Sequence, residues 1–574
     1  AWIEALKRLL PTRPWVAHNG KFDLTVLRRA GIQPGPLVGD SILAAYLLGT
    51  PKAGLKPLVF SEFGHRHITY EEVVGAGKNK RPLSDIDPQL VAEYCCGDAW
   101  WAVKLEAHLK AKLGEKALTL YENVDIPLVP ILVDMELLGI PLDGARAAEQ
   151  LEQCITQQQS LTIIIDMLAR EAGFSQPDRT WVCTACRNGK KKRLTCTVCN
   201  SIGKFSEPTP FNPNSSEQLI ALLHGTLALP VQRISRETGK ASCDALAMLR
   251  MKHFNPIIPL ILTTKKLDKQ RSMLVSWLAA SKKDGLIHTT FSNSWVRSGR
   301  LSSKDPNMQQ VALQWRDVFV AGEGKDLVAG DYGQIEVRIA AYVSHDPGLV
   351  RIMQQPPDTE AGDWHGQNTT KLFGIPYQEQ KQHKPLRTRA KNYGFGALYG
   401  SKGYEIVEVL EKQFLSDPDL EGEEVPDLTS IQQGVRTIRD LYPSYFDEWI
   451  PYELEMARQR GNVALTLYER PRQLPDLTSR NRQERGAAER ECISHVIQGT
   501  AADIIRMAML AAHSIPHGRL ALTIHDEILA RVDTAQSLWY SHELEQRMLL
   551  SQPFQDVPLV VNVTIADNWK GAHA

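Results

Sequence analysis

Residues 520–532, LALTIHDEILARV, place three polar residues between two apolar runs. Short apolar runs of this kind are typical of buried strands, so we expect a tight hairpin with His525, Asp526 and Glu527 at its turn. A carboxylate at the rim of a buried sheet is costly unless a cation meets it. The stretch alone leaves two interpretations open, a cation-binding site and an acidic surface turn.

The composition is that of a globular protein with several domains. The 574 residues are 43% hydrophobic and 23% charged, and 66 basic residues balance 66 acidic ones. This length suggests about three or four domains. With zero net charge, a nucleic-acid partner would have to be held by local basic patches. The start, AWIEALKRLL, lacks Met and predicts a helix, which favours a fragment or a processed product.

Apolar periodicity outlines the chain. Residues 1–115 alternate short apolar runs with helical patterns, as α/β domains do. Residues 120–143 predict a long amphipathic helix that Gly139 helps to end. DLVAGD, 326–331, predicts a buried strand that ends on an aspartate. Further helices are expected at 145–172, 215–225, 244–275 and over most of 346–515, and further strands at 519–532 and 558–565.

Asp331 and Asp526 share one local design, a carboxylate at the end of an apolar strand. Two carboxylates that converge at a sheet rim suit a pair of Mg²⁺ ions, ~3.5–4 Å apart, which stabilise both oxygens of an in-line phosphoryl displacement. This interpretation requires a triphosphate site elsewhere in the chain.

RTRAKNYGFGALYG, 387–400, predicts that triphosphate site. Arg387, Lys391 and Phe395 recur at steps of four and share one face of a helix. Two cations and a ring suit the phosphates and base of a nucleotide. The alternative is an ordinary helix with a solvated basic edge. Gly394 and Gly396 oppose it, because each costs a helix interior ~1 kcal/mol and favours a close approach instead.

The motifs resemble those of family-A DNA polymerases, the group of bacterial DNA polymerase I and many phage replicases. DYGQIEVR, RTRAKNYGFGALYG and IHDEI look like motifs A, B and C of this family, in order. Matching flanking segments are SGRLSSKDPNMQQ (298–310), DWHGQNT (363–369), AAERECISHVIQGTAADIIRMAM (487–509), FNPNSSEQL (211–219) and DNWKGAH (567–573). The resemblance implies a phage-type replicative DNA-directed DNA polymerase with thumb, palm and fingers.

The resemblance also implies roles for single residues. Asp331, Asp526 and the Tyr332 carbonyl would bind two Mg²⁺ ions, for which Mn²⁺ can substitute, with Glu527 as an accessory carboxylate. Lys391 would also protonate the leaving pyrophosphate, and Glu336 would exclude a ribose 2′-OH. The nucleotide-binding set is Arg387, Lys391, Phe395, Tyr399, Glu336, Gln334, His365 and Tyr332. The DNA-binding set is Arg300, Gln498, His525, Arg490, Lys191 and Lys192, the last two from an insertion described below.

Three departures from the family pattern bear on fidelity and DNA affinity rather than on the reaction. Ser494 stands where an Asn is usual, Glu469 and Pro471 interrupt a Gly-Arg-Arg run, and Asn392–Gly394 replace a Thr-Ile-Asn-like trio. Phe395, where some members carry Tyr, implies discrimination against dideoxynucleotides.

The N-terminal region resembles a ribonuclease-H-like 3′–5′ exonuclease domain without its first motif. AHNGKFD and YCCGD would supply Asp23, Tyr94 and Asp98, and Asp40 fits a structural or DNA-facing role. No Asp-x-Glu occurs in residues 1–110, so two of the family's usual carboxylates are missing. We therefore expect a truncated domain with weak or absent proofreading.

A cysteine-rich insertion predicts a zinc knuckle at 181–204. Cys183, Cys186, Cys196 and Cys199 form two CxxC pairs, and four thiolates suit a structural, tetrahedral Zn²⁺ site. The basic loop between the pairs, including Lys191 and Lys192, would either contact duplex phosphates, remain solvated or dock a processivity partner. The nine cysteines otherwise indicate a reducing compartment.

The predicted organisation has five parts: exonuclease-like domain 1–115, palm entry helix and thumb 116–280, palm with motif A 281–345, fingers 346–515, and palm with motif C 516–574. We expect a monomer in the cytosol of a bacterium or a phage-infected host, acting on primer–template DNA and dNTPs. Two rival interpretations are a non-catalytic DNA-binding protein on the same scaffold and a single-subunit RNA polymerase relative.

Overall fold

The computed structural model describes residues 2–50, 54–174, 191–192, 195–196, 211–235, 237–550 and 554–573. Its centre is a four-stranded antiparallel sheet in the order β12-β13-β9-β14. The strands are β12 (Gly518–Ile524), β13 (Glu527–Asp533), β9 (Lys325–Tyr332) and β14 (Val561–Ala566). The predicted hairpin is confirmed, with His525 and Asp526 in the turn and Glu527 opening β13.

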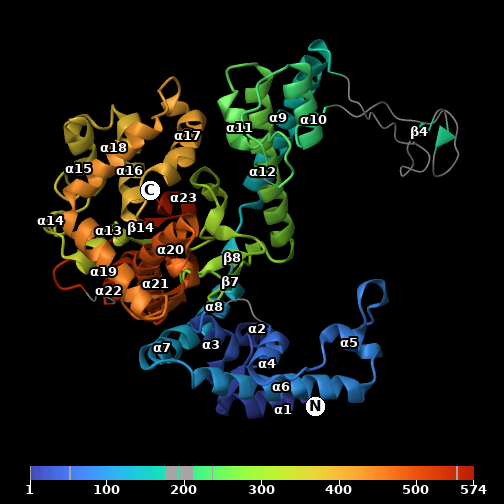
Figure 1. Cartoon of the computed structure of the whole chain (residues 1–574). Helices are drawn as coiled ribbons and strands as arrows, with labels where there is room; N and C mark the ends of the chain where they lie inside the picture. Colours follow the sequence, from blue (N-terminus) through green and yellow to red (C-terminus); the bar gives the residue numbers. More distant parts are fainter. Residues whose placement is uncertain are drawn as a thin grey trace.

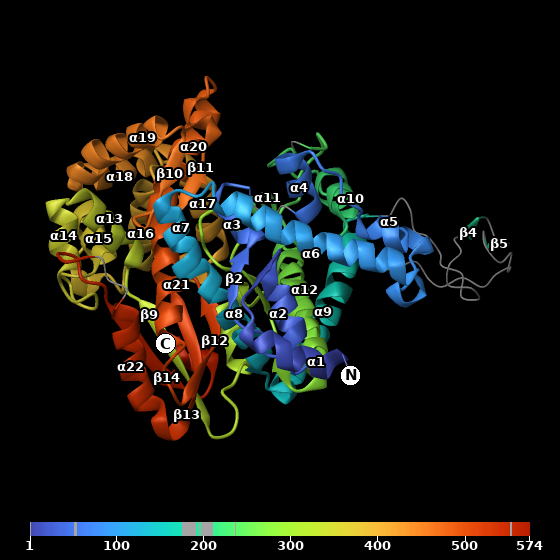
Figure 2. The ribbon, with the colours of Figure 1, turned by 90° about the horizontal axis from the view of Figure 1, so that it is seen from below.

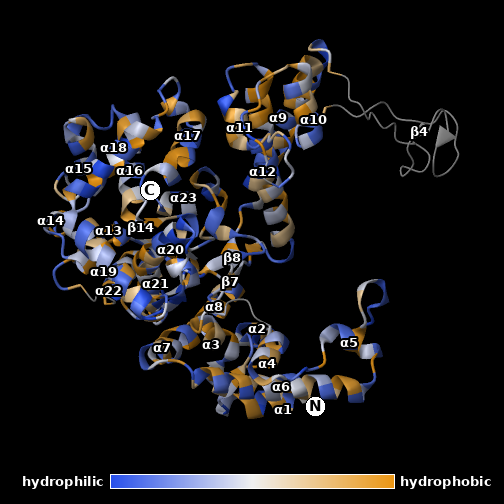
Figure 3. Cartoon of the chain, in the orientation of Figure 1, coloured by the Kyte–Doolittle hydropathy of each residue, from blue (hydrophilic) through white to orange (hydrophobic). Residues whose placement is uncertain are grey.

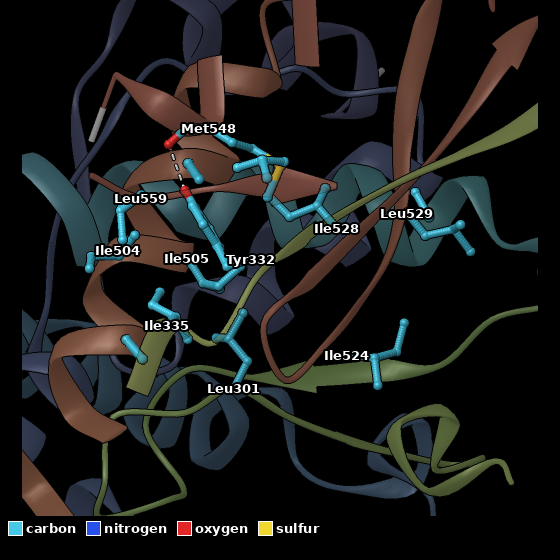
Figure 4. Packing of buried hydrophobic residues seen from close by; sticks show 14 of the residues in the cluster. Leu301, Tyr332, Ile335, Ile504, Ile505, Ile524, Ile528, Leu529, Met548 and Leu559 are labelled. Carbon is cyan, nitrogen blue, oxygen red and sulfur yellow. Dashed lines mark hydrogen bonds between the residues drawn. The ribbon is translucent and has the colours of Figure 1, made fainter. Parts of the chain in front are cut away.

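Helices cover this central sheet and complete its core. α22 (Ser537–Leu549) packs on β9 and β14, and α21 (Thr500–Ala512) packs on α22 (Figure 2). Buried apolar side chains of the strands and helices interdigitate between them, and the Tyr332 hydroxyl donates to the Met548 carbonyl at 2.6 Å (Figure 4). A Cβ at Gly330 would lie 2.6 Å from the Met548 sulfur, so glycine permits this close approach.

Residues 346–515, here called the helical unit, are mostly helical as predicted. Its first helices are α14 (Pro347–Met353), α15 (Trp364–Phe373) and α16 (Lys384–Leu398). α17 (Val407–Ser416), α18 (Leu428–Leu441), α19 (Ile450–Gln459) and α20 (Arg482–Ser494) follow. α13 (Ile335–Ser344) connects β9 to this unit. The short strands β10 (Val463–Leu465) and β11 (Pro471–Gln473) form a hairpin between α19 and α20.

Two long helices form an arm beside the sheet (Figure 1). α9 (Gly144–Glu171) packs along α12 (Ile257–Ala280), and the tip carries α10 (Ser216–Ile220) and α11 (Ala245–Arg250). Hydrophobic and hydrophilic residues mix along these helices (Figure 3). Buried residues of α12 such as Ile257, Ile261 and Thr264 recur at steps of three or four. The helix expected at 244–275 is in fact two, because the residues before Pro256, the N-cap of α12, turn out of the α11 helix.

The helix that joins the N-terminal region to the sheet corrects one prediction. It runs through α7 (Glu115–Leu120), a wide π-helical turn (Tyr121–Asp125) and α8 (Ile126–Leu138), and it ends at Gly139 with φ 63° as expected. It is not amphipathic. α8 contributes Leu128 and Leu132 to the core of the sheet, and Val129 and Val133 to the N-terminal core. A helix buried between two cores is apolar all round.

Residues 2–115, the N-terminal unit, have their own core. Two parallel strands, β1 (Trp15–Ala17) and β2 (Leu37–Asp40), pack against helices. The helices are α1 (Trp2–Leu9), α2 (Gly20–Arg29), α3 (Ser41–Leu47), α4 (Leu55–Phe63), α5 (Tyr70–Val74) and α6 (Pro88–Lys110). The minor strands are β3 (Ile140–Pro141), β4 (Lys191–Lys192), β5 (Thr195–Cys196), β6 (Leu286–Ile287), β7 (Thr290–Ser292) and β8 (Ser302–Lys304), and α23 (Trp569–Ala572) is the last helix. Within the described residues, no helix is both long and apolar enough to span a membrane.

Candidate active site

Asp331 and Asp526 meet at one end of the central sheet. Asp331 lies near the end of β9, and Asp526 lies in the β12–β13 turn. The backbone N–H of Tyr332 donates to the Asp526 carbonyl at 3.3 Å, which ties the turn to β9. His525 has a φ of 54°, a left-handed conformation that closes this turn tightly. Two residues 195 positions apart in the chain are thus held side by side through the backbone.

Both carboxylates lack full charge compensation. Burial raises the pKa of Asp526 to about 7, reinforced by the charges of Glu336 and Asp331 and only partly offset by Arg300. Burial and the charge of Glu527 raise the pKa of Asp331 to about 6. A divalent cation would supply the missing positive charge, so this donor pair fits Mg²⁺. Within the part of the chain that the structure describes, no cluster of three or more potential ligands is formed, so the fit rests on these two carboxylates.

Glu527 lies opposite Asp331 in the β13–β9 register, so the two side chains share one face of the sheet. Its buried carboxylate accepts hydrogen bonds from the Trp569 indole at 3.2 Å and from His573 Nδ1 at 2.5 Å. Arg316 lies 3.8 Å away. No role could be predicted for His573, Trp569 and Arg316. His573 and Trp569 belong to the matching segment DNWKGAH, 567–573, but nothing in that segment indicates which carboxylate it contacts.

Arg387, Lys391 and Phe395, which were predicted to share one face of a helix, all lie on α16. Arg387 donates to Asp363 at 2.7 Å and to Gln380 at 2.9 Å. Lys391 is exposed and forms no ion pair with any described residue. The ring of Phe395 lies 5.0 Å from that of His365. A Cβ at Gly394 would lie 2.8 Å from the Trp364 ring, so the predicted close approach is confirmed.

His365 joins the same surface as an uncharged group. Burial, together with the charges of Lys391 and Arg387, lowers its pKa to about 4, so the imidazole is neutral at pH 7. Nearby, the Gln334 amide donates to the Gly362 carbonyl at 3.1 Å, next to Asp363. The predicted residues of three segments therefore surround one location, where the positive charge resides on Arg387 and Lys391.

Glu336 connects this surface to the sheet. Its carboxylate accepts hydrogen bonds from Arg300 at 2.8 Å and from the Tyr399 hydroxyl. Burial and the Glu336 charge raise the pKa of Tyr399, and Gln498 also hydrogen-bonds its hydroxyl. The hydroxyl thus stays protonated and donates. Four predicted residues from four distant segments form one network beside Asp526.

Arg490 on α20 lines a groove of about 940 Å³ within the helical unit, formed by α18, α19, α20 and the segment after α16. It pairs with Glu405 at 2.8 Å. Local sequence patterns did not indicate the rest of the groove, in which Arg439, Arg482 and Arg485 accompany the exposed ring of Tyr404. Cations that alternate with aromatic rings suit a single-stranded nucleic acid.

In the N-terminal unit, the carboxylate of Asp98 on α6 lies against Lys56 and His67. Lys56 Nζ lies 2.6 Å from its carboxylate and His67 Nε2 lies 3.1 Å from it. Tyr94 packs against both, with its ring 4.5 Å from Lys56 Nζ.

Burial raises the pKa of Asp40 to about 6, and the charge of Asp23 adds to this effect. Asp40 is buried and accepts the N–H groups of Asn19, Gly20 and Ile42. No group of three or more potential metal ligands forms around Asp98 among the described residues.

The zinc prediction lies outside the described residues. Cys183, Cys186 and Cys199 are not described. Lys191, Lys192 and Cys196 are placed only as backbone, in the paired strands β4 and β5.

Comparisons with known proteins agree with this geometry. A family model described as DNA polymerase family A matches residues 188–571, and one described as a 3′-5′ exonuclease matches residues 1–114. DNA polymerase I of Chloroflexus aurantiacus is 31% identical over 97% of this chain and 55% of its own length. The thermostable DNA polymerase I of Thermus thermophilus is 31% identical over 80% of this chain and 49% of its own. The chain therefore spans about half the length of these relatives.

A solved structure shares the fold as well. The POL domain of Pol1 from M. smegmatis, in complex with DNA primer-template and dNTP, aligns with a TM-score of 0.77 at 25% sequence identity. The alignment covers 100% of this chain and 89% of that one.

Proposed function

The chain belongs to DNA polymerase family A, and from this premise we propose that it adds deoxynucleoside triphosphates to the 3′ end of a primer, directed by a DNA template. The observation that carries the proposal is the pair Asp331 and Asp526, two half-buried carboxylates without full charge compensation, together with α16, whose exposed Lys391 makes no ion pair with a described residue. The central sheet with residues 281–345 and 516–574 would be the palm, residues 116–280 the entry helix and thumb, and residues 346–515 the fingers.

Asp331 and Asp526, with the Tyr332 carbonyl, would hold two Mg²⁺ or Mn²⁺ ions. When bound, these ions stabilise the attacking and leaving oxygens of an in-line phosphoryl transfer. The side chains of the protein bind and orient the nucleotide. Arg387 and Lys391 would hold the triphosphate, Lys391 would give a proton to the leaving pyrophosphate, and Phe395 would stack near the incoming base.

The Glu336 network would select the sugar and place the template. Glu336 is held from two sides by Arg300 and Tyr399, so it would form a rigid wall against a ribose 2′-OH. Tyr399 would then lie at the templating position, and Gln498 with Arg300 would follow the minor groove at the primer end. His525, in the turn beside Asp526, would touch the primer terminus. Primer–template DNA is thus the proposed partner.

The insertion at 181–204 would bind one structural Zn²⁺ through its four cysteines. Metal analysis tests this proposal, with about one zinc per chain expected from tetrahedral thiolate ligation and loss of that zinc in Cys183→Ser. The basic loop with Lys191 and Lys192 would contact DNA or a processivity partner. These two roles are separated by measuring primer–template binding of the double variant Lys191→Ala, Lys192→Ala. Weaker binding than that of the intact chain indicates contact with DNA, and unchanged binding indicates a processivity partner.

Primer extension tests the central proposal. The intact chain is given a DNA primer–template, dNTPs and Mg²⁺, beside Asp526→Asn and the matched control Asp533→Asn. Asp533 lies at the far end of β13 and pairs with Lys325 on the surface. We expect extension by the intact chain and the control and none by Asp526→Asn. Absence of extension by the intact chain would favour a DNA-binding scaffold without catalysis.

A further inference from the structure

The tip of the arm touches the helical unit. α11 at the end of the arm packs against α17, and both views show the two helices together (Figures 1 and 2). The foot of the arm is anchored elsewhere, because Leu274 and Trp277 of α12 are buried in the core of the central sheet. α17 packs in turn on α16, which belongs to that same core through Tyr393 and Leu398. The sheet, the arm and the helical unit therefore each contact the other two.

The contact at the tip consists of ion pairs and hydrogen bonds, with the positive charges on the arm. Arg250 donates to both oxygens of Glu411, at 2.6 and 2.7 Å. Lys252 Nζ donates to the Leu415 carbonyl at 3.1 Å, in the last turn of α17, where a helix dipole favours a cation. Every cation of this contact belongs to the arm and every carboxylate to the helical unit. Two more pairs complete it, Arg233 with Glu408 at 3.3 Å and Lys252 with Glu421 at 3.9 Å.

This surface of the helical unit is suited to the arm and not to DNA. Glu408, Glu411 and Glu421 would repel the phosphates of a duplex. Bidentate arginine–carboxylate pairs are geometrically specific, and the side chains of Arg250 and Glu411 are only 28% and 17% exposed. More exposed pairs such as Arg233–Glu408 contribute little each and are screened by salt. The contact is therefore specific but weak enough to open.

We propose that the six charged residues of this contact form a latch that holds the arm against the helical unit and closes a path for DNA between them. The latch opens to admit DNA from the side and closes behind it, so that the enzyme stays on its template. This inference rests on the proposed function, because it places DNA between the arm and the helical unit. It adds an intramolecular surface whose role is retention and not chemistry.

Charge reversal is the first test. Dissociation from primed circular single-stranded DNA is measured in the presence of a heparin trap for Arg250→Glu, Glu411→Arg and the combined variant. Each single reversal should speed dissociation by about fivefold or more at low salt, and the combined variant should restore the original rate, as expected for a direct ion pair. Glu423→Arg is the control, because Glu423 is exposed on the neighbouring loop and makes no ion pair with a described residue.

The proposal would be overturned if the single variants dissociated at the rate of the original chain. It would also be overturned if the combined variant dissociated as fast as either single variant. Single-nucleotide incorporation on a short linear primer–template is measured in parallel and should be unchanged, because none of the six residues belongs to the proposed active site. If the intact chain itself incorporates no nucleotide, the proposed function has failed and not the latch.

Cross-linking gives an independent answer. Arg250→Cys with Glu411→Cys is joined by a bifunctional maleimide before DNA is added, beside each single cysteine variant treated in the same way. The joined enzyme should extend a short linear primer–template, which can thread through, and should fail on a primed closed circle. Full activity on the circle would show that DNA does not enter past the latch. Loss of activity on both templates would show that the chain cannot hold DNA while the arm is joined to the helical unit. Either result overturns the proposal.

Discussion

The carboxylate of Glu336 is fixed by two donors that come from distant parts of the chain, Arg300 and Tyr399. Glu336→Ala should remove the wall against a 2′-OH. We expect the ratio of kcat/KM for rNTPs to that for dNTPs to rise by about tenfold or more, the effect of about 1.4 kcal/mol at the transition state. Single-nucleotide incorporation with matched rNTP and dNTP measures the ratio.

Glu336→Gln is the control for this prediction, since an amide keeps the size of the side chain and can still accept a hydrogen bond from Tyr399. It should retain most of the sugar selectivity. An Ala variant as selective as the original chain would place the gate on another residue.

Residue identity was predictable where a motif carries it, whereas residue contacts were not. Local patterns already singled out Asp331, Asp526, Arg387 and Lys391, and the resemblance added a role for each. It did not predict that His573 would donate to Glu527, because the two residues are 46 positions apart and neither segment indicates its partner. Hydrogen-bond partners across such separations depend on tertiary packing, which local spacing does not encode.

At the scale of elements, a buried ionic cluster joins the wide turn at 121–125 to two other segments. Arg470 donates to Asp125 at 2.8 and 3.0 Å and to Asp503 at 2.6 Å, and Arg506 also donates to Asp125. These side chains are at most 1% exposed. Asp125→Ala leaves two arginines with one carboxylate and should destabilise the chain by about 3–5 kcal/mol, the usual cost of an unpaired buried charge.

Chemical denaturation followed by circular dichroism measures this loss. Asp134→Ala is the matched control on the same continuous helix, because Asp134 is 44% exposed and forms surface pairs with Arg28 and His513. The control should change the free energy of unfolding by less than about 1 kcal/mol. Equal effects of the two substitutions would mean that the cluster has no special role in stability.

His495, in the π-helical turn His495–Gly499 after α20, gives a pH prediction. Complete burial lowers its pKa from 6.5 to about 3, and its Nε2 hydrogen-bonds the Arg470 carbonyl at 2.9 Å. The folded state therefore binds this proton less readily than the unfolded state, so stability is lost as the pH falls below 6.5. At pH 5 the loss is roughly 2 kcal/mol for one such group.

Melting temperatures at pH 7 and pH 5 test this sign. His495→Gln keeps an N–H donor but cannot be protonated in this range, so its melting temperature should fall less between the two pH values than that of the original chain. His365, whose pKa burial lowers to about 4, is common to both proteins and cancels in the comparison. An equal fall in both would show that protonation of His495 does not control acid stability.

Elements were predicted well where the local pattern is distinct. The hairpin at 519–532 follows from its two short apolar runs, and the shared face of α16 follows from the steps of four between Arg387, Lys391 and Phe395. The helix predicted at 120–143 was expected to be amphipathic, but it lies between two cores. The break between α11 and α12 and the wide turn at 121–125 depend on packing, which the hydrophobic pattern does not reveal.

For the whole molecule, the order of segments was sufficient to predict a polymerase-like arrangement, because the motifs occur in the family's order. The latch between arm and helical unit was not predictable. In the sequence, its carboxylates and cations look like ordinary solvated charges. They come together only because the arm and the helical unit are both anchored in the core of the central sheet. Contacts between units are the level at which a single sequence is least informative.

The N-terminal unit supports a last prediction, that this chain extends a mispaired primer end or stalls on it but does not remove it. Two-metal cleavage needs several carboxylates around one site, yet Asp98 is paired with Lys56 and His67, and the described residues form no group of three or more potential metal ligands. A primer with a labelled 5′ end and a mispaired 3′ nucleotide is incubated with Mg²⁺ and no dNTP. No shortening is expected from the intact chain, and none from Lys56→Ala, because freeing Asp98 does not supply the missing carboxylates. Shortening that disappears in Asp98→Asn would contradict this prediction and show that another carboxylate joins Asp98 when DNA binds.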